Sequence, residues 1–366
     1  MPTSRGAPTL DHLRRYAVAR TLFKPTTLLR AIEKLGFVQA DPIRAPARAQ
    51  DLLLRHRVSG YSAGELERRY ARLAIEEDCL VNYGFLPRRH LALMHPRMAK
   101  AKWTPATKRK AAEVLAFVRE QGPTHPRAVE AAFAHGRRTN AWGGTSTATA
   151  HLLDGMHYRG LLRIARRDSG TRIYEAVEHA VADASPAARA QRAAALLELV
   201  VRKYAPLPAS SLVYLARLLG YGAPHLQAQT RSALATAREQ LASARIDGVS
   251  WHWPADENPR STRWRPDARV RLLSPFDPVV WDRRRFAQLW GWTYRFEAYT
   301  PAPQRKLGYY ALPMLWGDRI VGWANATVRD AKLVLTTHFP GEPVRDTAFF
   351  GELSDERERL STFLGL

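Results

Sequence analysis

Residues 146–174 read STATAHLLDGMHYRGLLRIARRDSGTRIY, a helical pattern that runs directly into a hairpin pattern. The spacing of apolar residues predicts a helix over 146–158. Two alternating segments around an Asp-Ser-Gly turn then predict a β-hairpin over 163–174. Two further helices are predicted just upstream, over 108–121 and 127–134. Three helices followed by a hairpin is the winged-helix arrangement, with 146–158 as the recognition helix and the hairpin as the wing.

The flanking regions extend this pattern in both directions. The region before it reads as helices, and the region after it repeats the order of helices and ends in a possible strand over 246–253. From Trp264 onward the chain is rich in aromatic residues and reads as antiparallel strands closed by a helix over 355–366. We therefore expect a mainly α protein with small β wings and a C-terminal β-rich α+β part. The expected division is 1–103, 104–185, 186–263 and 264–366.

The charge balance points to a polyanionic partner. The 366 residues include 56 Lys+Arg against 34 Asp+Glu, a formal net charge of +22. Such an excess favours binding to DNA, RNA or an anionic membrane surface. Arginine supplies 47 of the 56 cations, and its guanidinium can contact phosphate or guanine through two N–H groups at once. A GC-rich coding sequence would account for part of the arginine excess, but less readily for the net charge.

Several familiar site types are excluded by residue content. The single cysteine, Cys79, cannot form an intramolecular disulfide or a zinc ribbon. The 12 histidines show no metal-ligand spacing, and His-Glu-x-x-His, phosphate-loop and Gly-x-Ser-x-Gly motifs are missing from the sequence. Since these motifs are missing, we expect neither a metal nor a cofactor. No run of 18 apolar residues and no N-terminal signal core occur, so we expect a cytoplasmic protein.

One compact polar group, Gln39-Ala40-Asp41, lies between apolar residues. In an extended segment the side chains of Gln39 and Asp41 project to the same side. A partly buried carboxylate there could orient a water or stabilise a developing cation. Alternatively, Asp41 caps the next helix and Gln39 bonds to the backbone, and spacing alone favours this second interpretation.

Basic and hydroxyl side chains suggest where DNA would be contacted. A predicted helix over 44–57 places several arginines on roughly one face, which could follow phosphates or simply face solvent. The recognition helix begins with hydroxyl residues suited to phosphate contacts, and the wing carries four arginines. The candidate DNA-binding residues are Arg44, Arg48, Arg55, Arg57, Ser146, Thr147, Thr149, Arg163, Arg166, Arg167 and Arg172.

Three segments resemble the YcaQ-type crosslink-repair DNA glycosylases. The C-terminal signature corresponds to LLSPFDPVVWDRRR at 272–285, and to YTPAPQRKLGYY at 299–310 together with LWGDR at 315–319. The N-terminal catalytic segment of that family corresponds to GFVQADP at 36–42, followed by Ala-Arg-Ala at 47–49. The resemblance extends over nearly the whole chain.

The resemblance implies a fold, a reaction and a site. It implies tandem winged-helix modules around a concave DNA channel, followed by a β-containing part. The implied reaction is monofunctional hydrolysis of N7-alkylated purines and unhooking of N7-guanine interstrand crosslinks in double-stranded DNA, by a monomer. In the Gln-x-Asp version of the family motif, Asp41 would position water and balance charge at the sugar, while Gln39 would orient the water or hold the nucleotide. Two residues depart from the family pattern. Ala40 stands where the family usually has a bulkier apolar residue, and Gln50 stands where it usually has a histidine.

The chemistry agrees with this resemblance. Alkylation at N7 gives guanine a positive charge, so the base already leaves readily and no general acid is required. The transition state develops charge at the sugar, which a fixed carboxylate stabilises. The competing class is a non-catalytic winged-helix DNA-binding or regulatory protein, which would not need an oriented carboxylate at position 41. A metal-dependent nuclease would need clustered carboxylates that the sequence does not offer.

Overall fold

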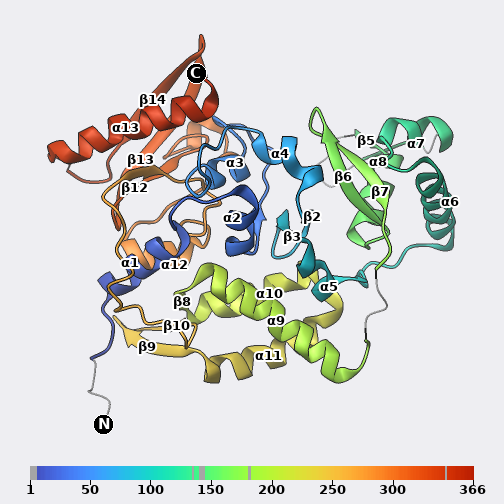
Figure 1. Ribbon diagram of the computed structural model, residues 1–366, viewed down its shortest axis with the longest axis horizontal. Coiled ribbons are helices and arrows are strands. Elements are labelled where there is room, and N and C mark those ends of the chain that lie inside the picture. Colours follow the sequence, from blue (N-terminus) through green and yellow to red (C-terminus); the bar gives the residue numbers. More distant parts are fainter. Residues whose placement is uncertain (1–5, 134–135, 140–144, 180–182, 343) are drawn as a thin grey trace. The chain divides into compact units, whose positions relative to one another are not determined.

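The computed structural model describes residues 6–133, 136–139, 145–179, 183–342 and 344–366 (Figure 1). The chain forms two compact units, each described on its own below. The first unit comprises residues 1–66, 197–215 and 234–366, so both ends of the chain belong to it. The second unit comprises residues 67–196 and 216–233.

The first unit is built around helix α1 (Leu10–Thr21), which packs against α12 (Arg283–Trp290). Apolar residues from α1, such as Leu13 and Val18, are buried with residues from the C-terminal part, such as Phe286. The core of this unit therefore joins segments more than 250 residues apart. Its other helical elements are α2 (Leu28–Leu35), α3 (Ala49–Leu54), the 3-10 turn Ala302–Gln304 and α13 (Thr347–Leu364).

A four-stranded antiparallel sheet forms the C-terminal part of the first unit (Figure 1). Its order is β11 (Val270–Leu272), β12 (Leu312–Trp316), β13 (Arg319–Arg329) and β14 (Lys332–His338), and α13 contacts β11 and β14. The turn between β12 and β13 contains Gly317 at φ +60°, a conformation that favours glycine. These strands confirm the β-rich reading of this region, although the last helix begins at Thr347 rather than at 355.

A smaller sheet in the first unit corrects the expected single strand over 246–253. The chain instead forms a hairpin of β9 (Ala242–Ile246) and β10 (Val249–Trp253), and β8 (Leu207–Pro208) joins the far side of β10. Asp247 and Gly248 both have positive φ, which produces the tight turn between the strands. The buried rings of Trp251 and Trp253 hold this sheet to the core of the unit.

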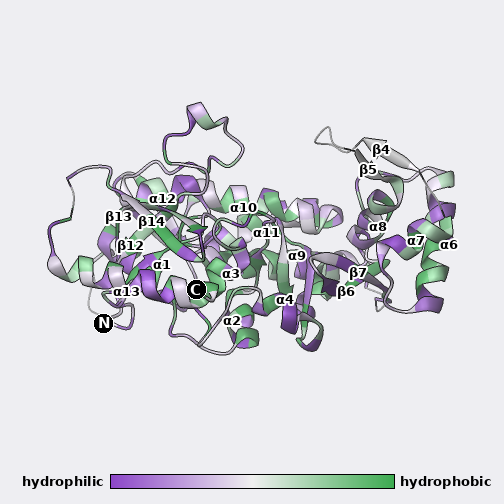
Figure 2. Cartoon of the chain, turned by 90° about the horizontal axis from the view of Figure 1, so that it is seen from above, coloured by the Kyte–Doolittle hydropathy of each residue, from purple (hydrophilic) through white to green (hydrophobic). Residues whose placement is uncertain are grey.

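The second unit contains the region from which the winged-helix prediction came. Helices α6 (Pro105–Gln121), α7 (Pro126–Phe133) and α8 (Ala148–Tyr158) are followed by the hairpin β6 (Leu162–Asp168) and β7 (Thr171–Ala176). Hydrophobic and hydrophilic residues occupy different sides of α6 (Figure 2), with Ala111, Val114 and Val118 buried. The predicted order of three helices and a hairpin is therefore present.

The start of the third helix differs from the prediction. Residues Thr145–Thr147 form strand β5, which pairs with β4 (Arg137–Thr139), and α8 begins only at Ala148. Threonine and serine are poor helix formers whose hydroxyls compete for backbone hydrogen bonds, so this run more readily joins a strand than a helix.

A second hairpin corrects the all-helical interpretation of the first 103 residues. Strands β2 (Ile75–Cys79) and β3 (Tyr83–Pro87) pair within the second unit, between the short turn Tyr70–Arg72 and the turn Arg88–His90 with α5 (Leu91–Met94). The acidic run Glu76-Glu77-Asp78 is buried in β2. Its carboxylates meet arginines from other segments, and such long-range pairing is not visible in local periodicity.

The remaining helices contribute residues to both units or lie at their chain boundaries. They are α4 (Glu65–Arg69), α9 (Pro186–Tyr204), α10 (Ala209–Gly222), the turn Pro224–Leu226 and α11 (Gln227–Gln240). With 45% helix and 19% strand the protein is mixed α/β, richer in strand than predicted. Within the described residues, no helix is both long enough and apolar enough to cross a membrane.

Candidate active site

The Gln-x-Asp segment follows directly from the end of α2. Gly36 closes that helix at φ +69°, and its N–H donates to the carbonyl of Ile32 at 2.9 Å. A Cβ at Gly36 would also approach the end of the Leu199 side chain at 2.5 Å, but the positive φ is the main reason that glycine is favoured here. Phe37 and Val38 are then fully buried. Strand β1 (Val38–Gln39) is buried and contacts α3 of the same unit.

Asp41 is half-buried and its carboxylate is already oriented. Oδ1 accepts a hydrogen bond from the backbone N–H of Ile43 at 2.9 Å. Burial raises the pKa of Asp41 above its usual value, and the hydrogen bond from Ile43 partly opposes that change. A carboxylate with a raised pKa is a better proton acceptor than an exposed one.

Gln39 is only 4% exposed, and its Oε1 finds no hydrogen-bond partner among the described residues. A buried amide oxygen without a donor is costly, by about 1–3 kcal/mol. Such an atom is typical of a site whose partner is a ligand or an ordered water. Gln39 and Asp41 thus present an unpaired acceptor and a carboxylate two residues apart on one extended segment.

The alternative role for Asp41, capping the next helix, does not apply. Helix α3 begins at Ala49, and Arg48 occupies its N-cap position. Pro42 and Pro46 interrupt the chain between Asp41 and that helix, because proline cannot donate a helical hydrogen bond. The predicted helix over 44–57 is shortened for the same reason. The backbone N–H of Asp41 instead faces Oε1 of the buried Gln50 at 3.4 Å.

The C-terminal motif lies near Asp41 in space. Burial and then the negative charge of Asp41 raise the pKa of both Tyr299 and Tyr310. Tyr310 is buried, whereas Tyr299 is 77% exposed. The segments 36–42 and 299–310, which carried separate parts of the resemblance, therefore lie in the same unit and within electrostatic range of each other.

The other C-terminal motif, residues 272–285, contributes two buried charged side chains that bind other segments of the first unit. Asp277 is fully buried and accepts hydrogen bonds from both terminal nitrogens of the fully buried Arg57, at 2.8 and 3.1 Å. Arg57 also donates to the carbonyls of Thr21 and Leu53. Arg285, likewise fully buried, donates to the carbonyl of Pro206 at 2.7 Å. These arginines hold backbone segments together.

Lys203 on α9 is a buried cation that bonds to the segment just before Gln39. Its Nζ donates to the carbonyl of Phe37, two residues before Gln39. Burial, reinforced by Arg57 and opposed by Asp277, lowers the pKa of Lys203 to about 7. This ammonium group therefore loses its proton near neutral pH, unlike an exposed lysine.

The replacement Lys203→Met should change how stability depends on pH. Between pH 7 and the unfolded-state pKa of 10.5, the folded protein binds fewer protons at Lys203 than the unfolded chain does. Its free energy of unfolding therefore rises with pH, by up to about 1.4 kcal/mol per pH unit. Urea unfolding at pH 7, 8 and 9 should show this rise in the parent protein and lose it in Lys203→Met. Lys332→Met, at an exposed strand position, should retain it. Equal pH slopes in the parent and Lys203→Met would contradict the assignment.

The candidate DNA-binding arginines near the site fall into two groups. Arg44 is exposed and Arg48 is half-buried, and both precede α3 instead of forming a stripe along a helix. Arg55 pairs with Glu356, and its side chain is 4% exposed. Arg57 is buried with Asp277, as described above. Of these four side chains, those of Arg44 and Arg48 retain exposed surface through which to meet a phosphate.

The hairpin arginines of the second unit bond to buried carboxylates. Arg163 contacts Glu76 at 2.9 Å, and Arg167 contacts Glu77 through Nε at 2.9 Å. Arg172 approaches Glu77 at 3.4 Å. These ion pairs tie the β6–β7 hairpin to β2, which fixes the position of the wing-like hairpin.

The remaining candidates occupy varied positions. The side chain of Arg166 is 47% exposed and pairs with Asp168 at the hairpin tip. Thr149 is buried within α8. Ser146 and Thr147 belong to strand β5, and not to a helix N-terminus.

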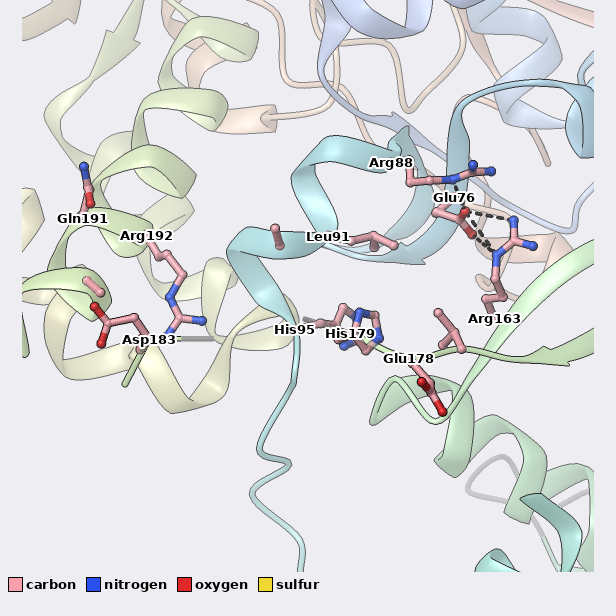
Figure 3. Close-up of a pocket in the computed structure, with 13 residues that line it drawn as sticks. Glu76, Arg88, Leu91, His95, Arg163, Glu178, His179, Asp183, Gln191 and Arg192 are labelled. Carbon is pink, nitrogen blue, oxygen red and sulfur yellow. Dashed lines mark hydrogen bonds and ion pairs between the residues drawn. The ribbon is translucent and has the colours of Figure 1, made fainter. Parts of the chain in front are cut away.

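A separate cavity of about 660 Å³ lies in the second unit (Figure 3). Figure 3 shows Arg88 and Arg163 directed at Glu76, beside the stacked rings of His95 and His179, whose centroids are 4.5 Å apart. Burial lowers the pKa of both histidines. Within the described parts of the chain, no group of three or more His, Cys, Asp or Glu side chains could hold a metal ion.

Sequence reasoning missed several residues of the site, although signals for them exist. Tyr299 stood inside a quoted motif but was not singled out. Lys203 is one of nine lysines in an arginine-dominated chain, so its position within an apolar helix is itself unusual. Outside this site, the glutamates that hold the hairpin of the second unit, Glu76 and Glu77, belong to a rare acidic run in a basic protein.

Comparisons with known proteins agree on one relationship. The family model described as DNA glycosylase AlkZ-like matches residues 32–363. The solved structure of the DNA glycosylase AlkZ from Streptomyces sahachiroi has a similar fold, with a TM-score of 0.63 and 14% sequence identity. The match covers 99% of this chain and 98% of that chain.

Proposed function

Because this chain belongs to the AlkZ-like DNA glycosylase family and is therefore a DNA glycosylase, we propose that it removes N7-alkylated purines from double-stranded DNA. We extend the proposal to the unhooking of N7-guanine interstrand crosslinks, since each crosslink contains the same cationic leaving group. Gln39 and Asp41 are the proposed catalytic residues. The observation that carries the proposal is a half-buried, oriented Asp41 carboxylate two residues after Gln39, whose buried Oε1 has no hydrogen-bond partner among the described residues.

In the proposed reaction, a water oxygen adds to C1′ of the deoxyribose. The bond between C1′ and N9 breaks, and its electron pair neutralises the positive charge of the alkylated base. Asp41 stabilises the positive charge that develops at the sugar and accepts a proton from the attacking water. Gln39 Oε1 accepts a hydrogen bond from that water or from the nucleotide. No general acid is required, because the base leaves as a neutral molecule.

We propose that α6, α7, α8 and the β6–β7 hairpin form a winged-helix module, one of several arranged along a concave DNA channel. The element order supports this interpretation. In this proposal Arg44, Arg48 and Arg166 contact phosphates. Ser146, Thr147 and Thr149 belong to the winged-helix module and lie on its proposed DNA-facing side. Arg163, Arg167 and Arg172 add positive charge while holding the hairpin in place. The enzyme acts as a cytoplasmic monomer on chromosomal DNA.

Binding to undamaged duplex DNA should depend strongly on salt. If about six phosphates are neutralised, a plot of log K against log salt concentration should have a slope near −5. Arg44→Ala should reduce the magnitude of that slope by about 1. Arg345→Ala, which removes an exposed arginine outside the proposed set, should leave it unchanged. Fluorescence anisotropy between 50 and 300 mM salt measures these slopes, and a slope between 0 and about −2 would contradict the proposed phosphate contacts.

The activity itself is tested with three duplexes in the presence of a metal chelator. One carries N7-methylguanine, one an N7-guanine nitrogen-mustard crosslink, and one uracil as a neutral control base. We expect release of free N7-methylguanine, unhooking of the crosslink and no release of uracil, measured by chromatography and denaturing gels. DNA binding without release from either damaged duplex would favour the non-catalytic regulatory alternative. Release only after a divalent metal is added would contradict the metal-free mechanism.

A further inference from the structure

An aromatic cluster of the first unit includes two tyrosines that lie within electrostatic range of Asp41. The Phe296 ring contacts Phe276 at 5.2 Å, Tyr310 at 5.3 Å and Tyr299 at 6.1 Å between ring centroids, each in an edge-to-face arrangement. Phe276 and Phe296 are partly buried and Tyr310 is buried, whereas Tyr299 is 77% exposed. The cluster thus ends in one largely solvent-exposed ring.

The loop that carries Tyr299 is rigidly held. The buried carboxylate of Glu297 accepts hydrogen bonds from the backbone N–H groups of Lys306 and Leu307, at 2.8 and 2.7 Å. The N–H of Thr300 donates to the carbonyl of Glu297, and Arg305 Nε donates to the carbonyl of Thr300 at 2.7 Å. These bonds fix the backbone on both sides of Tyr299. An exposed aromatic ring on a fixed loop loses little conformational entropy when it binds a ligand.

The surroundings of this ring favour a cationic partner. The negative charge of Asp41 acts on the hydroxyls of both Tyr299 and Tyr310, and it favours a positively charged group near them. A tyrosine face carries negative quadrupole density and attracts a cation placed over it. Arg283 and Arg305 stack on the neighbouring rings of Tyr294 and Tyr309. No cation stacks on the Tyr299 ring within the described residues.

We propose that the Tyr299 ring, backed by Phe296, is the subsite that stacks on the positively charged base of the damaged nucleotide while Asp41 faces its sugar. This inference rests on the proposed function and adds the physical basis of lesion selection. A purine alkylated at N7 is a flat cation, and it differs from normal guanine chiefly in that charge. Stacking on Tyr299 therefore recognises the lesion by its charge, without requiring a pocket shaped for one alkyl group. The same subsite accepts a methyl adduct or one arm of a crosslink.

The test separates charge recognition from catalysis by using two duplexes that are not cleaved. One contains N7-methylguanine with a 2′-fluoro sugar, which is cationic. The other contains 7-methyl-7-deazaguanine, which has nearly the same shape and is neutral. Affinities for both are measured for the parent protein, Tyr299→Leu and Tyr299→Phe. Phe350→Leu is the control because it removes another exposed ring of the same unit.

We expect the parent protein to prefer the cationic duplex by about tenfold, a typical effect of stacking on one aromatic side chain. Tyr299→Leu should lose that preference, while Tyr299→Phe and Phe350→Leu should keep it. An unchanged preference in Tyr299→Leu would overturn the inference, as would equal binding of both duplexes by the parent protein. The activity assay with N7-methylguanine is independent of this result. Absence of base release there, with the charge preference intact, would overturn the proposed function and leave the subsite standing.

Discussion

Asp41→Asn should lower the single-turnover rate of N7-methylguanine release by about 10²–10³-fold, the usual cost of removing one oriented group that stabilises developing charge. Asparagine retains the shape of the side chain and an oxygen that can accept the hydrogen bond from Ile43. It loses the negative charge and the ability to accept a proton. The measurement is the rate of base release at saturating enzyme, so that weaker DNA binding does not contribute.

The melting temperature provides the control for Asp41→Asn, because it shows whether the variant still folds. Burial raises the pKa of Asp41 in the folded protein, so ionisation of this carboxylate at neutral pH disfavours folding. Removing the charge should therefore leave the melting temperature unchanged or raise it. The parent protein should also lose activity on acidification at a pH above the ordinary carboxylate value of 3.8. Full activity in Asp41→Asn would exclude the carboxylate from the reaction.

Arg57→Ala should destabilise the protein by about 3–5 kcal/mol, because it leaves the buried carboxylate of Asp277 without its partner. Both side chains are 0% exposed, and Arg57 also supports the carbonyls of Thr21 and Leu53. The effect should appear as a lower urea midpoint and, at 37 °C, as loss of soluble protein.

The matched control is Arg119→Ala, which breaks an exposed ion pair with Glu178 at 3.2 Å. Exposed pairs contribute about 0–1 kcal/mol, so this variant should melt near the parent. The double variant Arg57→Met with Asp277→Leu removes both charges and should be more stable than Arg57→Ala. A cost below about 1 kcal/mol for Arg57→Ala would contradict the structural role assigned to the buried pair.

Sequence patterns correctly predicted the helices, strands and turns that are determined mainly by neighbouring residues in the chain. The helix and hairpin periodicities of α6, α7, β6 and β7 and the Gly317 turn were found almost at their observed positions. The predictions failed where long-range pairs decide the structure. Strand β2 is acidic and does not resemble a buried strand, yet Arg88, Arg163 and Arg167 neutralise its glutamates.

The candidate site could be predicted only in part for a similar reason. Gln39 and Asp41 were recognisable because they lie two residues apart in a segment that resembles a family motif. Spacing alone favoured helix capping, and only the observed start of α3 removes that role. The aromatic cluster around Tyr299 depends on contacts between loops, which no periodicity encodes. The expectations for the individual DNA-binding residues and for the four-part division remain predictions.

The pairing of Arg57 with Asp277 has a consequence for how the enzyme is made. The two residues are 220 positions apart, so at about 5–20 residues per second the ribosome needs roughly 10–45 s to supply the partner of Arg57. The core that holds Asp41 also takes in the C-terminal sheet, so the nascent N-terminal segment cannot close its core before the final strands emerge. Asp41 therefore reaches its final position only after the C-terminal sheet has been synthesised. If the proposed function holds, shorter chains would not create abasic sites in DNA.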